Sequence, residues 1–119
     1  MAEKNSSAYL VINSQIFTLD NPVTRIGRKI DNDLVIQDPL ISRSHAEIRL
    51  QSGGFTLVDL NSTTGTHLNN QRITQHKLSS GDLFYLANIP IMFIEDTPAL
   101  QNNLNMNTGT LKLPGEPKP

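Results

Sequence analysis

Three polar segments of the sequence carry residue types that can bind an oxyanion. The first is the pair Gly27-Arg28, the second runs from residue 40 to 46, and the third runs from residue 59 to 66. Hydroxyl groups and backbone N–H donors beside a fixed cation are the components of such a site. Arginine suits it better than lysine, because its planar guanidinium matches two phosphate oxygens at once. Serine, threonine, asparagine and glycine are also ordinary turn residues, so these segments alone leave the function open.

The apolar residues between these segments follow the period of β-strands. Residues 46–50 alternate between apolar and charged side chains, as in a strand with one buried face. Residues 55–60 are predicted to be the neighbouring strand. Gly53-Gly54 between them is predicted to supply the positive φ of a tight hairpin turn.

Further short strands are expected along most of the chain. Their predicted ranges are 9–12, 15–19, 23–26, 34–36, 65–68, 76–78, 83–87 and 89–94. Short strands at this spacing, separated by Gly, Asn, Asp and Ser, indicate an all-β fold, a two-sheet antiparallel β-sandwich with little helix. Pro90 cannot donate to a strand ladder, so the last strand is predicted to lie at an edge or to break there.

The character of the sequence changes at about residue 97. An Asn-rich stretch is followed by Gly109, Pro114, Gly115, Pro117 and Pro119, and such a composition buries too little apolar surface to offset its ordering entropy. We therefore predict a flexible N-terminus at residues 1–7, a folded domain at residues 8–96 and a disordered C-terminal tail at residues 97–119. A linker to a further domain and a simple terminus both remain open for the tail.

Composition argues against several classes of protein. The net charge of −1 does not suit a non-specific nucleic-acid binder. There is no cysteine for disulfides or thiolate metal sites, and no apolar run approaches the roughly 20 residues that cross a bilayer. The polar start lacks the apolar region of a secretory signal. We expect a cytoplasmic domain with no cofactor and no nucleic-acid or membrane partner.

An enzymatic function is also disfavoured. Ser42 or Ser44 beside His45, with Asp59 as orienter, could suggest a nucleophile and base, but there is no G-x-S-x-G turn. Neighbouring residues on a strand also point to opposite faces. The three histidines show no recognisable metal-ligand spacing. A sugar-binding sandwich is unsupported, since the chain has no tryptophan and two tyrosines. We therefore predict no catalytic and no metal-binding residues.

The order and spacing of the three segments resemble the forkhead-associated (FHA) domain. The motifs that carry the resemblance are Gly27-Arg28, Ser42-x-x-His45 and Ser62-Thr63-x-Gly65-Thr66 followed by Leu68-Asn69. The resemblance covers roughly residues 9–94 and includes Asp33 and the pair Arg72-Ile73. It implies a non-enzymatic β-sandwich whose loops bind phosphothreonine in partner proteins.

The resemblance also implies roles for individual residues. Arg28 would reach the phosphopeptide, the hydroxyls of Ser42 and Thr63 would bind phosphate oxygens, and Arg43 would be a second phosphate contact. Thr64 occupies the position that holds the peptide main chain. The residues expected to structure the loops are Gly27, His45, Gly65 and Asn69. His45 would connect loops through hydrogen bonds and would not act as an acid or a base.

The chain departs from the family pattern in its third loop. Thr64 stands where the family usually has asparagine, and its shorter hydroxyl cannot reproduce both an amide donor and an acceptor at the same reach. Asn61 replaces a glycine, although asparagine tolerates positive φ well. These changes leave phosphate binding possible and put affinity and peptide selectivity in question.

Two functions follow from the resemblance. The first is a phosphothreonine-binding module in a larger signalling protein, with substrates of a Ser/Thr kinase as candidate partners. The second keeps the fold but makes it a scaffold or dimerisation module that binds partners independently of phosphate.

Overall fold

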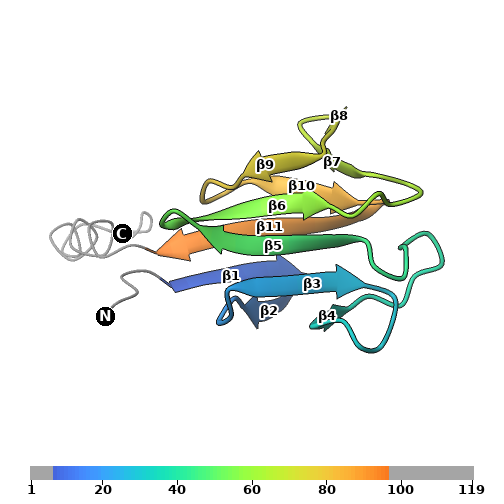
Figure 1. The fold of residues 1–119 in the computed structure, drawn as a ribbon, viewed down its shortest axis with the longest axis horizontal. Helices are drawn as coiled ribbons and strands as arrows, with labels where there is room; N and C mark the ends of the chain where they lie inside the picture. Colours follow the sequence, from blue (N-terminus) through green and yellow to red (C-terminus); the bar gives the residue numbers. More distant parts are fainter. Residues whose placement is uncertain (1–6, 97–119) are drawn as a thin grey trace, which may run out of the picture. The chain divides into compact units, whose positions relative to one another are not determined.

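The computed structural model describes residues 7–96, which form eleven strands and no helix (Figure 1). The strands are β1 (Ser7–Ile12), β2 (Gln15–Thr18), β3 (Val23–Gly27), β4 (Leu34–Val35), β5 (Ala46–Gln51), β6 (Gly54–Asp59), β7 (Thr66–Leu68), β8 (Gln71–Arg72), β9 (Gln75–Lys77), β10 (Leu83–Leu86) and β11 (Ile89–Asp96). No helix in this part of the chain could span a membrane. The predicted tail at residues 97–119 lies outside the described residues.

The strands form two sheets. One has six strands in the order β2-β1-β11-β10-β7-β8, and the other has five in the order β4-β3-β5-β6-β9. The predicted β-sandwich is confirmed, with one exception to its antiparallel pairing, since the short strand β4 runs parallel to β3. The strand β8 was not predicted, because its two residues, Gln71 and Arg72, are polar and exposed and give no apolar strand signal.

The core lies between the inner faces of the two sheets. Along β1 and β10, buried and more exposed residues alternate, as the period of a strand requires. Phe55 of β6 and Phe93 of β11 meet across the core with ring centroids 5.7 Å apart. Ile41 is also a core residue, although it lies in the loop between β4 and β5. Its burial anchors the loop that carries Ser42 and Arg43.

The turn between β5 and β6 differs from its prediction. Gln51 pairs with Gly54, so the two turn residues are Ser52 and Gly53, with φ of 51° and 79°. Gly54 is the first residue of β6 and its φ is not positive. Two central residues with positive φ make a type I′ hairpin turn, whose twist matches that of the strands. The turn between β1 and β2, at Asn13-Ser14, has the same form, with φ of 52° and 64°.

The prediction for Pro90 was wrong. The strand β11 is continuous and lies between β1 and β10, so it is not an edge strand. Pro90 pairs with Tyr85, one position beyond the closing pair Leu86–Ile89 of the hairpin. Hydrogen-bonded and non-hydrogen-bonded pairs alternate along an antiparallel ladder. The closing pair takes the hydrogen bonds, so the pair at Pro90 needs no N–H toward β10.

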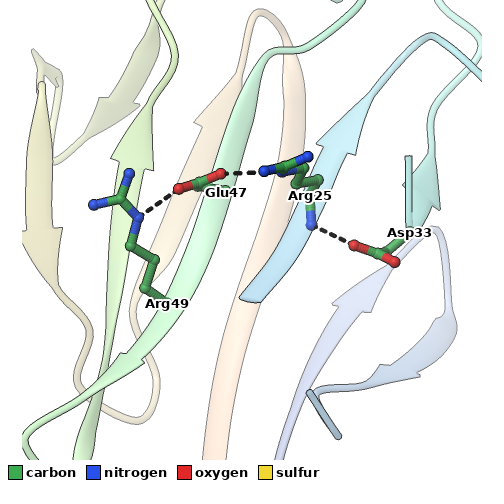
Figure 2. Close-up of polar contacts among 4 residues, drawn as sticks. All are labelled: Arg25, Asp33, Glu47 and Arg49. Carbon is green, nitrogen blue, oxygen red and sulfur yellow. Dashed lines mark hydrogen bonds and ion pairs between the residues drawn. The ribbon is translucent and has the colours of Figure 1, made fainter. Parts of the chain in front are cut away.

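The outer face of the five-stranded sheet carries an ion-pair network (Figure 2). The side chain of Glu47 on β5 is nearly buried between Arg49 and Arg25, and its carboxylate accepts from the Nε of each. The backbone N–H of Arg25 donates to Asp33 at 2.8 Å. Asp33 therefore attaches the loop after β3 to the edge of that strand.

The turn assignment predicts opposite effects for two adjacent glycines. Gly53→Ala should lower the free energy of unfolding by about 1–2 kcal/mol, because an L side chain is strained at positive φ. Gly54→Ala should be neutral or stabilising by up to about 1 kcal/mol, because alanine narrows the unfolded ensemble. Its added Cβ would meet only the flexible end of Lys77, at 3.0 Å. Urea unfolding of the two variants measures both effects, and equal losses would contradict the assignment.

Candidate functional site

Three loops meet around a cavity of about 200 Å³ at the ends of the strands. Arg28 comes directly after β3, Ser42 lies in the loop between β4 and β5, and Thr63 and Thr64 lie between β6 and β7. All four line the cavity, together with residues 39–41. The structure thus brings together four of the five residues predicted to bind the phosphopeptide. Arg43 does not line the cavity.

The guanidinium of Arg28 is anchored through its Nε atom. Its Nε donates to the carbonyl oxygen of Ile41 at 2.9 Å, and its backbone N–H donates to the carbonyl of Ser42 at 3.0 Å. Within the described part of the chain, no hydrogen bond or ion pair engages its terminal amino groups. Arg28 therefore presents a fixed positive charge with donors left for an anion.

The hydroxyl of Ser42 is oriented by the third loop. Its Oγ accepts the backbone N–H of Thr63 at 3.0 Å. A serine hydroxyl has one donor proton in addition to its lone pairs. Since Oγ acts as the acceptor in this contact, the proton remains for a ligand in the cavity. The same bond holds Thr63, whose side chain is exposed, beside Ser42.

His45 is fully buried and joins the second loop to the third. Its Nδ1 accepts the backbone N–H of Ser42 at 3.1 Å, and its Nε2 lies 2.9 Å from the carbonyl oxygen of Gly65. These partners require a neutral ring with its proton on Nε2. Burial lowers the pKa of His45, and this effect exceeds the opposing influence of the bond to Gly65 and the charge of Asp59.

This geometry argues against the nucleophile–base alternative. His45 contacts the backbone N–H of Ser42, not its hydroxyl, so the ring has no free nitrogen to accept a proton from that hydroxyl. Asp59 makes its hydrogen bonds to the third loop and none to the ring of His45. Among residues 7–96 no cluster of His, Asp or Glu could hold a metal ion.

The third loop is organised around Asp59. Its carboxylate accepts from the Ser62 hydroxyl at 2.5 Å, from the Thr66 hydroxyl at 2.7 Å and from the Ser62 backbone N–H at 3.1 Å. Partial burial alone would raise the pKa of Asp59, but the three hydrogen bonds together outweigh it and lower that pKa. Arg72 also donates to the carbonyl oxygen of Ser62 at 2.7 Å.

The supporting roles of Asp59 and Arg72 were missed by sequence reasoning. Asp59 was considered only as the orienter of a catalytic histidine, and Arg72 only as part of a motif. An Asp three residues before a Ser is a local turn signal that could have identified the first contact. Nothing in the sequence signals the contact of Arg72.

Thr64 joins the third loop to the second. Its Oγ1 donates to the carbonyl oxygen of Leu40 at 2.7 Å. The hydroxyl proton is therefore taken up by the Leu40 carbonyl, and only lone pairs remain for a ligand. Asn61, the other departure from the family pattern, adopts φ of 60°, the left-handed conformation that asparagine tolerates.

The two glycines permit close approach between loops. A Cβ on Gly27 would lie 2.2 Å from the carbonyl oxygen of Arg43, an impossible distance. That carbonyl also accepts from the Nδ2 of Asn32 at 2.7 Å, so the backbone of Arg43 is fixed. Gly65 has φ of 95°, and its Cβ would contact Arg72 and His67.

Asn69 lies away from the cavity. It forms the two-residue turn between β7 and β8 with Asn70, and both residues have positive φ. Its place in the structure is thus a hairpin turn beside the third loop rather than a contact within the cavity.

The chain matches the family model described as FHA domain over residues 24–87. It is 40% identical over 79 residues to the oxoglutarate dehydrogenase inhibitor of Corynebacterium diphtheriae, and 37% identical over 78 residues to the glycogen accumulation regulator GarA of Mycolicibacterium smegmatis. Each match covers 66% of this chain, and 55% and 49% of the respective relative. The chain therefore spans about half the length of the curated relatives it matches.

Two solved structures share the fold. Mycobacterium tuberculosis EmbR in complex with a low-affinity phosphopeptide is 32% identical, with a TM-score of 0.71, over 74% of this chain and 24% of EmbR. An FHA domain solved in a study of phosphothreonine-dependent interactions is 32% identical, with a TM-score of 0.70, over 74% of this chain and 95% of its own.

The lowered pKa of His45 predicts that the folded domain becomes less stable as the pH is lowered. In the unfolded chain the imidazole takes up a proton near its ordinary pKa of 6.5, whereas the folded ring resists protonation. The unfolded state then binds more protons, so stability is lost as pH falls from 6.5 toward the lower folded-state value. The loss is at most about 1.4 kcal/mol per pH unit.

Urea unfolding between about pH 7.5 and about pH 5 measures this slope. Asp59 does not contribute in this range, because the ordinary pKa of its carboxyl is 3.8 and its folded-state pKa is lower still. A His45→Gln variant serves as the control, since it should be less stable throughout and lack this part of the slope. An equal slope in both proteins would contradict the prediction.

Proposed function

Because the chain belongs to the FHA domain family, we propose that it binds phosphothreonine-containing segments of partner proteins. Its role is then a regulatory one, a phosphorylation-dependent contact within Ser/Thr kinase signalling in the cytoplasm. The observation that carries the proposal is the cavity in which Arg28, Ser42 and Thr63 meet. The proposed domain comprises residues 8–96, and residues 1–7 and 97–119 are proposed to lie outside it.

The donors around the cavity suit a phosphate group. A phosphothreonine carries about −1.5 to −2 charges and three strong acceptor oxygens. The terminal amino groups of Arg28 can pair with two of these oxygens, and the hydroxyls of Ser42 and Thr63 can donate to the third. Because Ser42 is already oriented by Thr63, these groups need little ordering when the ligand binds.

The remaining predicted residues would act around this centre. We assign Arg43 a contact with the peptide from outside the cavity, where its exposed side chain adds positive charge. Gly27, His45 and Gly65 would act indirectly, by fixing the distances between the loops. Since both ring nitrogens of His45 have protein partners, we propose a binding function without catalysis.

The proposal covers the domain alone. Among the relatives, one is named an inhibitor of oxoglutarate dehydrogenase and another a regulator of glycogen accumulation. This chain covers about half of each, so their targets are not carried over. What is carried over is the binding of a phosphorylated segment, the ligand of the related EmbR structure.

Removal of Arg28 should abolish most of the affinity. A hydrogen bond to a charged group is worth roughly 1.5–3 kcal/mol, so Arg28→Ala should weaken binding of a phosphothreonine peptide about tenfold to more than a hundredfold. Isothermal titration calorimetry with the phosphorylated peptide and its unphosphorylated twin measures this effect. The unphosphorylated peptide should not bind.

Arg25→Ala is a matched control for this experiment. Arg25 is an exposed arginine on the same strand as Gly27, but it pairs with Glu47 on the outer face of the sheet and does not line the cavity. Its removal should leave the affinity unchanged. Loss of binding in both variants, or in neither, would contradict the site assignment.

Thr64 gives a sharper test of how the peptide is held. Thr64→Asn should supply a longer side chain whose amide can donate to and accept from the main chain of the peptide. One or two neutral hydrogen bonds gained in this way contribute about 0.5–1.5 kcal/mol each. Affinity for the phosphothreonine peptide should rise roughly 2-fold to 50-fold, and the unphosphorylated peptide should stay unbound.

Thr64→Val separates this effect from loop support. Valine keeps the shape of threonine but loses the hydrogen bond from Oγ1 to Leu40. Affinity should then fall modestly, because one wall of the cavity loosens. If Thr64→Asn weakens binding as Thr64→Val does, the hydroxyl itself is needed at this position and the predicted gain is wrong.

A further inference from the structure

A second cavity, the edge cavity, lies where the edge strands β4 and β2 of the two sheets come together (Figure 1). Its volume is about 270 Å³. The five-stranded sheet lines it with residues 34–38, which comprise β4 and the chain that follows it. The six-stranded sheet lines it with Ile12, Asn13, Gln15 and Ile89. The edge cavity shares no lining residue with the cavity around Arg28.

The main chain of β4 has free hydrogen-bonding groups on the side away from β3. The strand β4 pairs with β3 alone, and Val35 lies opposite Gly27. The N–H of Ile36 donates to the carbonyl oxygen of Gly27 at 2.9 Å. Because the main-chain groups of successive strand residues point to opposite sides, the N–H and C=O of Val35 point away from β3. Among residues 7–96 no hydrogen bond engages either group, so this edge can pair with an extended chain.

The side chains of the edge cavity suit an aliphatic residue. The aliphatic lining residues are Ile12, Leu34, Val35, Ile36 and Ile89. The one charged lining residue is Asp38, whose carboxylate accepts the N–H of Leu40 at 2.9 Å. An acidic side chain in the edge cavity would therefore lie near a like charge, with no cation among the lining residues.

The edge cavity lies close to Arg28. Val35 pairs with Gly27, the residue directly before Arg28, and the neighbours Asp38 and Pro39 line the edge cavity and the cavity of Arg28 respectively. A strand added beside β4 would lie two strand spacings from β3, so its main chain would be roughly 10 Å from the backbone of Arg28. About three or four residues of extended chain span that distance.

We propose that the edge cavity binds the flank of the same partner segment whose phosphothreonine is held by Arg28 and Ser42, a proposal that rests on the proposed function. The flank lies extended along β4 and pairs through its main chain with the N–H and C=O of Val35. A residue about three or four positions from the phosphothreonine places an aliphatic side chain in the edge cavity. Main-chain pairing contributes affinity for any sequence, and the cavity adds selectivity at that one position.

The small number of free groups on β4 favours this occupant over a separate partner. Val35 offers one donor and one acceptor, which contribute too little to hold an independent peptide in water. A segment already bound through its phosphate meets the same edge at high effective concentration, so weak contacts there add to its affinity.

Isothermal titration calorimetry with a set of phosphothreonine peptides tests the proposal. The parent peptide has alanine at about six positions on each side of the phosphothreonine, and each other peptide replaces one alanine with valine. At one position, about three or four residues from the phosphothreonine on one side, valine should bind roughly 3-fold to 15-fold more tightly than alanine. Aspartate at that position should bind more weakly than alanine.

Val35→Pro removes the outward N–H of β4 and no hydrogen bond to β3. It should weaken binding of the best valine peptide about 2-fold to 10-fold. A peptide truncated just beyond the phosphothreonine should bind this variant as it binds the wild type, because it does not reach β4. Val35→Ile keeps the N–H and is the matched control, which should retain the affinity for both peptides.

A charge placed in the edge cavity locates the flank independently. Gln37 is an exposed lining residue, and Gln37→Lys should raise the affinity for a peptide with glutamate at the selected position about 2-fold to 5-fold, relative to glutamine there. The ratio is the measure, because an added lysine also attracts the phosphate of both peptides. Gln75→Lys is the matched control, since Gln75 is exposed on β9 at the opposite edge of the same sheet.

The outcomes separate this proposal from the proposed function. Equal affinity for valine and alanine at every position, with binding that still needs the phosphate and Arg28, would overturn the edge site alone. So would a glutamate-to-glutamine ratio that Gln37→Lys leaves unchanged or that Gln75→Lys changes equally. If Val35→Pro weakens the truncated peptide as well, that ratio decides. Absence of phosphate-dependent binding by every peptide would overturn both proposals.

Discussion

The binding loops depend on one buried side chain, His45. Its ring accepts a hydrogen bond from the backbone of Ser42 and lies in hydrogen-bonding contact with the carbonyl of Gly65, so it joins the second loop to the third. Two side-chain contacts between these loops, Thr63 to Ser42 and Thr64 to Leu40, lie near the surface. A backbone bond also joins them, since the N–H of Leu60 donates to the carbonyl oxygen of His45 at 2.9 Å. Among the side-chain contacts, the bond of the His45 ring to Gly65 is buried, and a shielded hydrogen bond holds its geometry most strongly. The spacing of the cavity-lining hydroxyls follows from that ring.

The polar groups of the loops divide into two sets. One set is used within the protein. Asp59 accepts from the hydroxyl and the backbone N–H of Ser62, and Arg72 donates to the carbonyl oxygen of Ser62. The other set has no protein acceptor among residues 7–96 and consists of the terminal amino groups of Arg28 and the hydroxyl proton of Ser42. The first set makes the loops rigid, and the second leaves donors facing the cavity, where Thr64 adds the lone pairs of its hydroxyl. Such donors, including the cationic ones of Arg28, favour a ligand that is rich in acceptors and negatively charged.

Most of the fold could be predicted because strand periodicity is a local property, readable within residues 46–50 alone. The turn between β5 and β6 was placed one residue late, because the pair Gly53-Gly54 hides which glycine has positive φ. Motif order selected Arg28, Ser42, Thr63 and Thr64, which the fold brings around one cavity, but it did not reveal the contacts that support them. The bond of Arg72 to Ser62 depends on β8, whose two polar, exposed residues give no strand signal. The bond of Thr64 to Leu40 joins residues that only the folded chain brings together.

Folding constrains the side chains on the inner faces of the two sheets more than those on the outer faces. Both inner faces must be apolar, because the core between them supplies the hydrophobic stabilisation. The outer faces need not be apolar. The outer face of the five-stranded sheet instead carries the ion-pair network of Arg25, Glu47 and Arg49. Exposed apolar side chains such as Ile16 and Tyr85 add little to the core and increase the risk of aggregation. The cavity of Arg28, Ser42 and Thr63 is lined by loop residues alone, so neither outer face contributes a side chain to it.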